Sequence, residues 1–197
     1  MKHPSPKHFV VAGLLAMAGV AQADTVTFDS LANADVFQYT TDTYTEQGYS
    51  FAATLQTGGD SLYSWGAASG LDADPTGATL SQVYDGFGVV ASRTGGGSFT
   101  LTSFDLADRY NQGTGGTVHF DYTDAQGMHS SDLVLADQPG LQTFTFDYTG
   151  LTSFTLWDTN YQLDNVVVTA EAIAVPEPAS VVLLLSGLAL LARRRKA

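Results

Sequence analysis

The amino-acid sequence predicts an all-β protein, a two-sheet antiparallel β-sandwich of the jelly-roll type. Between Asp24 and Ala170 no apolar stripe recurs at the helical period. Short runs of alternating apolar and polar residues recur instead, and Gly, Asp, Asn or Pro separates one run from the next. About nine such runs, without an internal repeat, favour a closed sandwich over a solenoid or a propeller.

The first third of this region is predicted to hold two short strands and a long loop. Residues 25–28 and 48–53 alternate, which is typical of strands with one buried face. Residues 57–77 are rich in Gly, Ser and Asp, and we expect them to form a loop that carries Tyr63 and Trp65.

A hairpin and a bulged strand are predicted next. Residues 78–84 and 87–91 would pair around a tight turn. In the strand that follows, Phe99 and Leu101 share one face, whereas the next apolar pair, at 104 and 106, shares the other. A bulge or a bend near residues 102–103 would keep all four side chains inside the sandwich.

The last strands show the clearest alternation. They are predicted at residues 118–122, 133–135, 144–148, 151–158 and 161–169. In the fourth of these, Phe154 and Leu156 form the buried face, so Trp157 is predicted to point outward. Residues 166–168 are all Val, and a strand that is apolar on both faces should be covered on both sides.

The sandwich, residues 24–172, is preceded by a predicted signal peptide at residues 1–23. A basic start and an apolar core at residues 9–20 are followed by Ala21 and Ala23 of a small-x-small cleavage site. We therefore expect a signal helix at this end and an exported body of roughly 150 residues, enough for one domain.

Residues 175–197 are predicted to be a C-terminal sorting signal. Its motif residues are Pro176, Glu177, Pro178, Arg193, Arg194 and Arg195. The apolar run between the prolines and the arginines, residues 179–192, would form a helix about 21 Å long, short of the ~30 Å hydrocarbon core of a membrane. A generic C-terminal membrane anchor is the alternative.

This tail resembles the PEP-CTERM sorting signal of Gram-negative bacteria. The resemblance implies that an exosortase in the inner membrane recognises the tail and cuts near residues 176–178. The membrane-bound form would then be an intermediate, and the body would be released to the cell surface or to the extracellular polysaccharide matrix.

The charge of the body excludes some partners. All but Glu177 of the 20 acidic residues lie in the body, whereas its only basic residues of the Lys and Arg type are Arg93 and Arg109, giving a net charge of about −17. Nucleic acid is therefore excluded as a partner, because phosphate binding needs clustered Lys and Arg. With no cysteine, the fold rests on its core.

Calcium is the candidate cofactor. Residues 99–107 and 162–168 are similar to strands of the galactose-binding-like jelly rolls of carbohydrate-binding modules. That resemblance implies a structural calcium ion held by Asp164 at the start of the last strand. Asp29 would contribute if the two ends of the body meet. The alternative is that Asp164 only caps a turn or faces solvent.

Sugar binding is the second candidate chemistry, because sugar rings stack on aromatic side chains. The available platforms are Trp157, predicted to point outward, and Trp65, Tyr63 and Tyr110, predicted on loops. The alternative is that these rings only pack against the fold.

The sequence thus favours an exported, non-enzymatic module that associates with glycans or matrix. The alternative is a small secreted hydrolase acting on polysaccharide, and a third reading is a passive surface protein. Glycoside hydrolysis needs a pair of carboxylates, and none stands out. Glu46, the only Glu before the last strand, is predicted on a surface turn.

Overall fold

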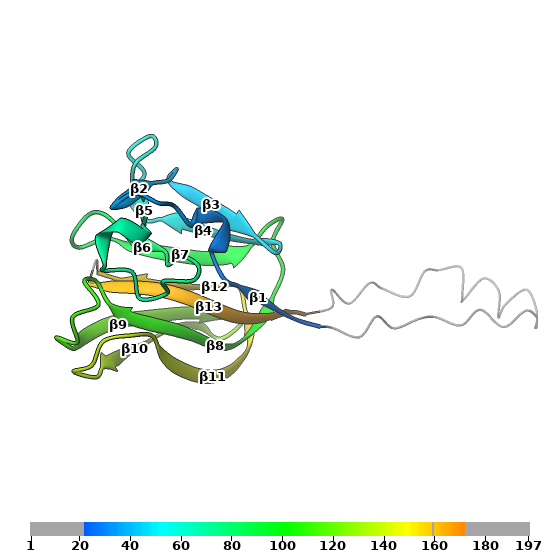
Figure 1. The fold of residues 1–197 in the computed structure, drawn as a ribbon. Coiled ribbons are helices and arrows are strands. Elements are labelled where there is room, and N and C mark those ends of the chain that lie inside the picture. Colours follow the sequence, from blue (N-terminus) through cyan, green and yellow to red (C-terminus); the bar gives the residue numbers. More distant parts are fainter. Residues whose placement is uncertain (1–21, 159, 172–197) are drawn as a thin grey trace, which may run out of the picture.

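The computed structural model describes residues 22–158 and 160–171, and these form the predicted antiparallel sandwich. One sheet has four strands in the order β1-β13-β8-β11, and the sheet packed against it has six in the order β10-β9-β12-β7-β4-β3 (Figure 1). A third, three-stranded sheet, β2-β5-β6, was not predicted. The predicted terminal helices lie outside the described residues.

Among the described residues, the three sheets together contain 13 strands. The four-stranded sheet contains β1 (Ala23–Val26), β8 (Phe99–Asp108), β11 (Gln142–Leu151) and β13 (Tyr161–Ala170). The six-stranded sheet contains β3 (Thr43–Glu46), β4 (Tyr49–Ala53), β7 (Gly88–Arg93), β9 (Gly116–Asp124), β10 (Gly127–Leu135) and β12 (Ser153–Trp157). The small sheet contains β2 (Phe37–Tyr39), β5 (Leu62–Trp65) and β6 (Ser81–Gln82). Two short 3₁₀ helices are η1 (Asp29–Leu31) and η2 (Ala67–Ser69).

The core lies between the two large sheets and is built around phenylalanine. The ring centroid of Phe104 lies 5.6 Å from that of Phe120 and 5.8 Å from that of Phe154, and all three side chains are buried. Burying one such side chain contributes about 1.5–3 kcal/mol to folding. Alternation in β9 and β12 therefore decides which face of the six-stranded sheet turns inward.

The predicted bulge in β8 is confirmed. Phe99, Leu101, Phe104 and Leu106 are all fully buried although their spacing changes phase. The pairing of β8 with β13 shifts register between Ser103 and Leu101, which leaves one extra residue on β8. That bulge turns the second pair of apolar side chains back to the core.

The predicted hairpin of residues 78–84 and 87–91 is wrong. A turn does occur there, with the Phe87 N–H donating to the Tyr84 carbonyl at 3.4 Å, but it joins two different sheets. β6 pairs with β5, whereas β7 lies between β4 and β12. Two strands joined by a tight turn need not pair when each finds a partner elsewhere.

The predicted long loop at residues 57–77 is also wrong in its middle, which contains β5 and η2. Every residue of β5 is buried, so the strand shows no alternation that a sequence pattern could reveal. The small sheet is attached to the sandwich at Leu80 and Leu163, each of which donates its N–H to the carbonyl of the other at 2.9 Å.

Both ends of the body lie at one end of the sandwich. β1 and β13 run side by side, with Ala23 opposite Thr169 (Figure 1). Just beyond β13, the Arg93 guanidinium donates to the Glu171 carbonyl at 3.2 Å, and the Glu171 carboxylate accepts from the Gly150 N–H at 2.6 Å. Among the described residues, no helix has the length and apolar character needed to cross a membrane.

Candidate functional site

An aromatic patch forms on one face of the small sheet. β2 and β5 pair so that Phe37 lies opposite Trp65 and Tyr39 lies opposite Tyr63. Residues two apart on a strand point to the same face, so this register brings all four rings together. We call these four residues, with Tyr110, the aromatic patch.

The rings of the aromatic patch pack edge to face. Ring centroids are 5.2 Å apart for Phe37 and Tyr39 and 5.3 Å apart for Tyr63 and Trp65. Tyr110, on the turn after β8, lies 6.0 Å from Trp65. Trp65 and Tyr63 are buried, whereas Phe37, Tyr39 and Tyr110 are 44%, 48% and 46% exposed. The exposed rings therefore rest on a buried aromatic floor.

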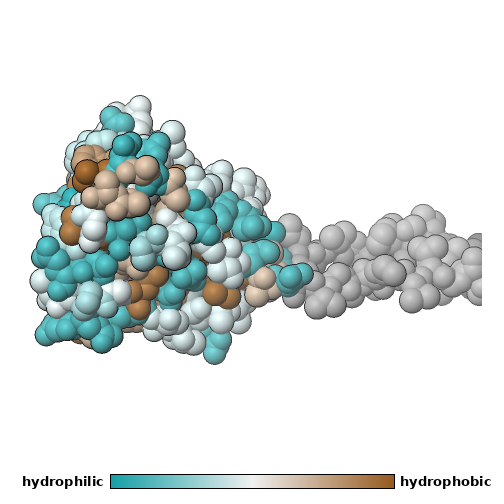
Figure 2. Space-filling model, viewed as in Figure 1, coloured by the Kyte–Doolittle hydropathy of each residue, from teal (hydrophilic) through white to brown (hydrophobic). Residues whose placement is uncertain are grey.

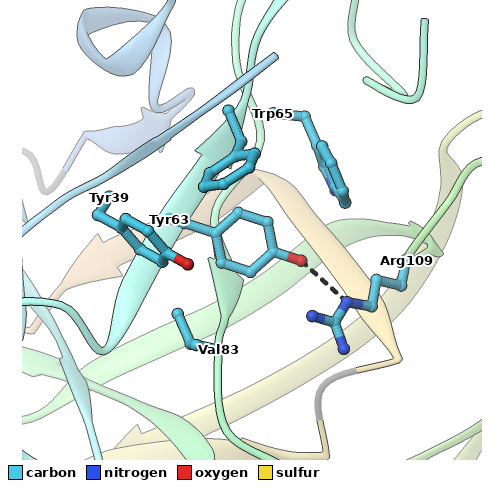
Figure 3. A pocket seen from close by; sticks show the side chains of 6 residues that line it. Tyr39, Tyr63, Trp65, Val83 and Arg109 are labelled. Atoms are coloured by element: carbon cyan, nitrogen blue, oxygen red, sulfur yellow. Dashed lines mark hydrogen bonds between the residues drawn. The ribbon is translucent and has the colours of Figure 1, made fainter. Parts of the chain in front are cut away.

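A hollow of about 90 Å³ opens in this patch between the rings of β2 and β5 and the side chains of Val83 and Arg109 (Figure 3). In the space-filling view, brown and tan residues lie near the β2 end of the molecule, and other brown residues lie lower on the same face, on a mostly teal and white surface (Figure 2). The indole Nε1 of Trp65 is buried and finds no hydrogen-bond acceptor in the described part of the chain. The Trp65 indole is thus held by packing, whereas most buried polar groups also have a hydrogen-bond partner.

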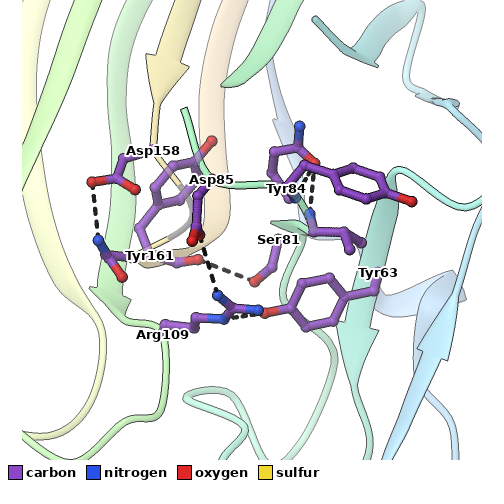
Figure 4. Close-up of polar contacts among 10 residues, drawn as sticks. Tyr63, Ser81, Tyr84, Asp85, Arg109, Asp158 and Tyr161 are labelled. Carbon is purple, nitrogen blue, oxygen red and sulfur yellow. Dashed lines mark hydrogen bonds and ion pairs between the residues drawn. The ribbon is translucent and has the colours of Figure 1, made fainter. Parts of the chain in front are cut away.

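Arg109 lies against the patch at the end of β8. Its Nε donates to the Tyr63 hydroxyl at 3.1 Å, and its guanidinium carbon lies 5.8 Å from the Tyr63 ring centroid and 5.5 Å from that of Tyr110 (Figures 3 and 4). Burial raises the pKa of Tyr63, while the Arg109 charge opposes that shift. Tyr63 is therefore a neutral phenol that fixes the guanidinium in place.

A second, polar hollow of about 260 Å³ lies on the other side of Arg109. Its lining includes Thr114, Thr117 and Asn160. Its shape depends on Asp108, whose carboxylate accepts hydrogen bonds from the backbone N–H groups of residues 110, 112 and 113 at 3.0, 3.2 and 2.7 Å. The buried carboxylate of Asp108 thus fixes the backbone of the Gly-rich loop after β8, and part of this loop lines the polar hollow.

Three of the predicted sugar platforms meet in the patch, but not as predicted. Tyr63 and Trp65 lie on strand β5 and form its buried floor rather than a loop. Tyr110 does lie on a turn and is exposed. Phe37 and Tyr39 were not predicted, although two aromatic residues two positions apart are a signal for one shared face.

Trp157 lies elsewhere, on the outer face of the six-stranded sheet. As predicted, Phe154 and Leu156 are buried and Trp157 points away from them. Its Nε1 donates to Asp121 Oδ2 at 2.6 Å. His119, opposite Trp157 in the register, contacts Asp121 through Nε2 at 3.1 Å and Asp132 through Nδ1 at 2.7 Å.

The two predicted calcium ligands lie in an acidic part of the fold. Asp164 is fully buried and accepts a hydrogen bond from the Asn165 N–H at 2.6 Å. A Cβ atom on Gly77 would overlap carboxylate oxygens of both Asp29 and Asp74. Within residues 22–158 and 160–171, however, no group of three or more His, Cys, Asp or Glu side chains is arranged to hold a metal ion. Calcium binding by Asp29 and Asp164 stays a prediction.

Glu46, considered for the hydrolase alternative, is not on a surface turn. It ends β3, and its carboxylate accepts hydrogen bonds from the Thr27 and Phe28 N–H groups at 3.3 and 3.2 Å and from the Tyr44 hydroxyl at 2.6 Å. Phe28 has a positive φ of 57° at the start of η1. Glu46 therefore fastens the end of β1 to β3, which is a structural use of its carboxylate.

The chain thus combines an all-β sandwich, an outward aromatic patch and a tail of the sorting type. Residues 174–196 match the model of the PEP-CTERM protein-sorting motif, which contains all six predicted sorting residues. The motif implies export by way of an exosortase to the cell surface. Those six residues, and Ala21 of the predicted signal cleavage site, lie outside the described residues, whereas Ala23 begins β1.

Comparison with known proteins gives a likeness to a solved structure. No curated protein matches the chain. Among solved structures it is similar to the carbohydrate-binding module CBM6cm-2 from Cellvibrio mixtus lichenase 5A in complex with cellotriose. The identity is 12% and the TM-score 0.28, over 69% of this chain and 97% of that one.

Proposed function

We propose that the protein is a non-catalytic, glycan-associating module of the extracellular polysaccharide matrix, and that the aromatic patch is its binding surface. The observation that carries the proposal is the arrangement of Phe37, Tyr39 and Tyr110, three rings that are about half exposed on a floor of buried rings. Apolar faces of sugar rings stack on such side chains, while the surrounding polar groups bond the hydroxyls.

The polar groups needed for sugar hydroxyls surround the patch. The Tyr39 and Tyr63 side chains and Arg109 line the aromatic hollow, and the polar hollow beyond Arg109 adds Thr114 and Thr117. An interaction site made of large apolar surfaces with a few fixed polar groups suits a carbohydrate better than a lipid or a nucleic acid.

The proposed route to the matrix begins with a signal peptide cut after Ala23 in a Gram-negative cell. The sorting tail then holds the chain in the inner membrane until an exosortase cuts near Pro176, and the body reaches the surface. An intact mass of the surface form that still includes Ala197 would contradict this route.

Polysaccharide retention tests the proposed binding. The exported form of the protein should be retarded in gels that contain the host's own extracellular polysaccharide. Tyr39→Ala should weaken binding about tenfold, because a lost aromatic contact removes up to roughly 1.5 kcal/mol. Val134→Ala is the matched control, since Val134 is 70% exposed on β10, in another sheet. Equal retardation of both variants would refute the assignment of the patch.

A further inference from the structure

Arg109 is an unusual cation in this protein. Arg93 and Arg109 are the only Lys or Arg side chains among the described residues. Arg93 has a structural task, because its Nη1 donates to the carbonyls of Ser98 at 3.0 Å and Glu171 at 3.2 Å, at the end of the sandwich where the chain leaves. In a body with a net charge of about −17, the other cation is placed in the aromatic patch.

Arg109 is held firmly by its neighbours and pairs with an exposed carboxylate. The Tyr63 hydroxyl and the rings of Tyr63 and Tyr110 fix the guanidinium, and its side chain is only 23% exposed. Its ion-pair partner is Asp85, whose Oδ1 lies 4.0 Å from Arg109 Nη1 and whose side chain is 90% exposed (Figure 4). Exposed pairs of this kind contribute about 0–1 kcal/mol, so another carboxylate can compete for the guanidinium.

The position of Arg109 matches a charged sugar. It lines both hollows, with aromatic rings on one side and hydroxyl and amide groups on the other. A sugar ring that stacks on the exposed rings would bring a substituent of the same ring toward the guanidinium. The planar fork of Arg binds a carboxylate through two hydrogen bonds, and such charge-assisted bonds are stronger than those to a neutral hydroxyl.

The acidic character of the body limits how many charges the bound polymer can carry. Screening limits repulsion to about 8 Å at physiological ionic strength, so the carboxylates nearest the bound polymer decide it, and Asp85 lies 4.0 Å from Arg109. A polymer with an anion on every sugar would meet Asp85 and, along its length, further carboxylates of a body with a net charge of about −17. A mainly neutral chain with separated carboxylates avoids this cost and still supplies one carboxylate to Arg109. Arg109 therefore favours a ligand with a carboxylate, and the negative charge of the body favours a ligand with few of them.

We propose that the aromatic patch recognises a uronate, an acidic sugar residue, within a sparsely charged polysaccharide, and that Arg109 binds its carboxylate in place of Asp85. This inference rests on the proposed function of the patch. It adds to that function the chemical class of the sugar and the density of charge on the polymer.

The test compares one polymer before and after its charge is removed. The exported form is titrated with a glucuronoxylan and with the same polymer after carbodiimide activation and borohydride reduction, which turns each carboxylate into a hydroxymethyl group. The wild type should bind the unreduced polymer about tenfold more tightly, the effect of one charge-assisted contact. Arg109→Gln should bind both forms equally, and Arg109→Lys should keep part of the preference.

The matched control is Gln126→Glu, at the exposed turn between β9 and β10, which changes the net charge as much as Arg109→Gln does. It should keep the full preference. Equal wild-type affinity for both polymers, with weakening of both by Tyr39→Ala, would overturn the uronate assignment and leave the proposed function intact. Tighter binding of polygalacturonate, with a carboxylate on every sugar, would overturn the charge-density condition. No binding to these or to neutral glucans would overturn the proposed function itself.

Discussion

Replacing Asp164 with Asn should stabilise the protein at neutral and alkaline pH. Burial, reinforced by the carboxylates of Asp74, Asp29 and Asp105, raises the pKa of Asp164 to about 8. In an unfolded chain the pKa of an Asp is about 3.9. Between these two values the folded state keeps a proton that the unfolded state has released, so the free energy of unfolding falls as pH rises from about 4 to about 8.

The size of the effect follows from this shift. Three pH units at ~1.36 kcal/mol each give about 4 kcal/mol between pH 5 and pH 8. Partial access of solvent to the surrounding carboxylates reduces this figure, and we expect about 2–3 kcal/mol. Asn keeps the acceptor for the Asn165 N–H, which lies 2.6 Å from Asp164 Oδ1, and it carries no charge at any pH.

Urea unfolding of the wild type and Asp164→Asn at pH 5, 6, 7 and 8, with chelator present, measures the effect. The two stabilities should be similar at pH 5, and the variant should be the more stable at pH 8. Asp60→Asn, at an exposed position, removes the same charge and should not change the slope. A variant less stable than the wild type at pH 8 in chelator would refute the reasoning. Calcium that stabilises the wild type and not the variant would instead establish the metal site expected from the sequence.

Three further changes test other parts of the structure. Gly88→Ala should lower the melting temperature by several degrees, because the new Cβ would overlap the Leu156 carbonyl across β7 and β12; unchanged melting would contradict that contact. Glu46→Ala should cost about 2 kcal/mol in urea unfolding, since two backbone N–H groups at the end of β1 lose a charged acceptor; a change below measurement error would argue against this fastening role. Asp132→Asn should lower the pKa of His119, measured by NMR titration, because the hydrogen bond with Asp132 is the largest cause of its raised pKa. In the wild type, the contribution of the protonated His119 to folding stability is complete below pH ~6.5 and is lost as pH rises through the raised pKa of His119.

The fold could be predicted where one face of a strand is buried and the other is not. Phe154 and Leu156 alternate with polar residues in β12, and this pattern fixed both the strand and the outward direction of Trp157. The change of phase in β8 was equally informative, because four buried apolar residues with this spacing require a bulge or a bend, and the structure has a bulge.

The small sheet could not be predicted because its strands break that rule. β5 is buried on both faces and β2 is exposed at every residue, so neither alternates. The candidate site depends on the register between them, which pairs Tyr39 with Tyr63 over a separation that local patterns do not reveal. Arg109 joins the site only through tertiary packing, and the sequence showed it merely as a rare basic residue.

The arrangement of the two ends also determines how the body bears mechanical load. A pull on the C-terminal end of the described residues would act along β13, and β13 is hydrogen-bonded on one side to β1 and on the other to β8. Pulling β13 along its own axis would have to break its hydrogen bonds to β1 and to β8 together, and not one pair after another. The Arg93 contact to the Glu171 carbonyl adds a lock where the force enters. β13 is thus among the strands best placed to resist such a pull, and the aromatic patch belongs to a separate small sheet.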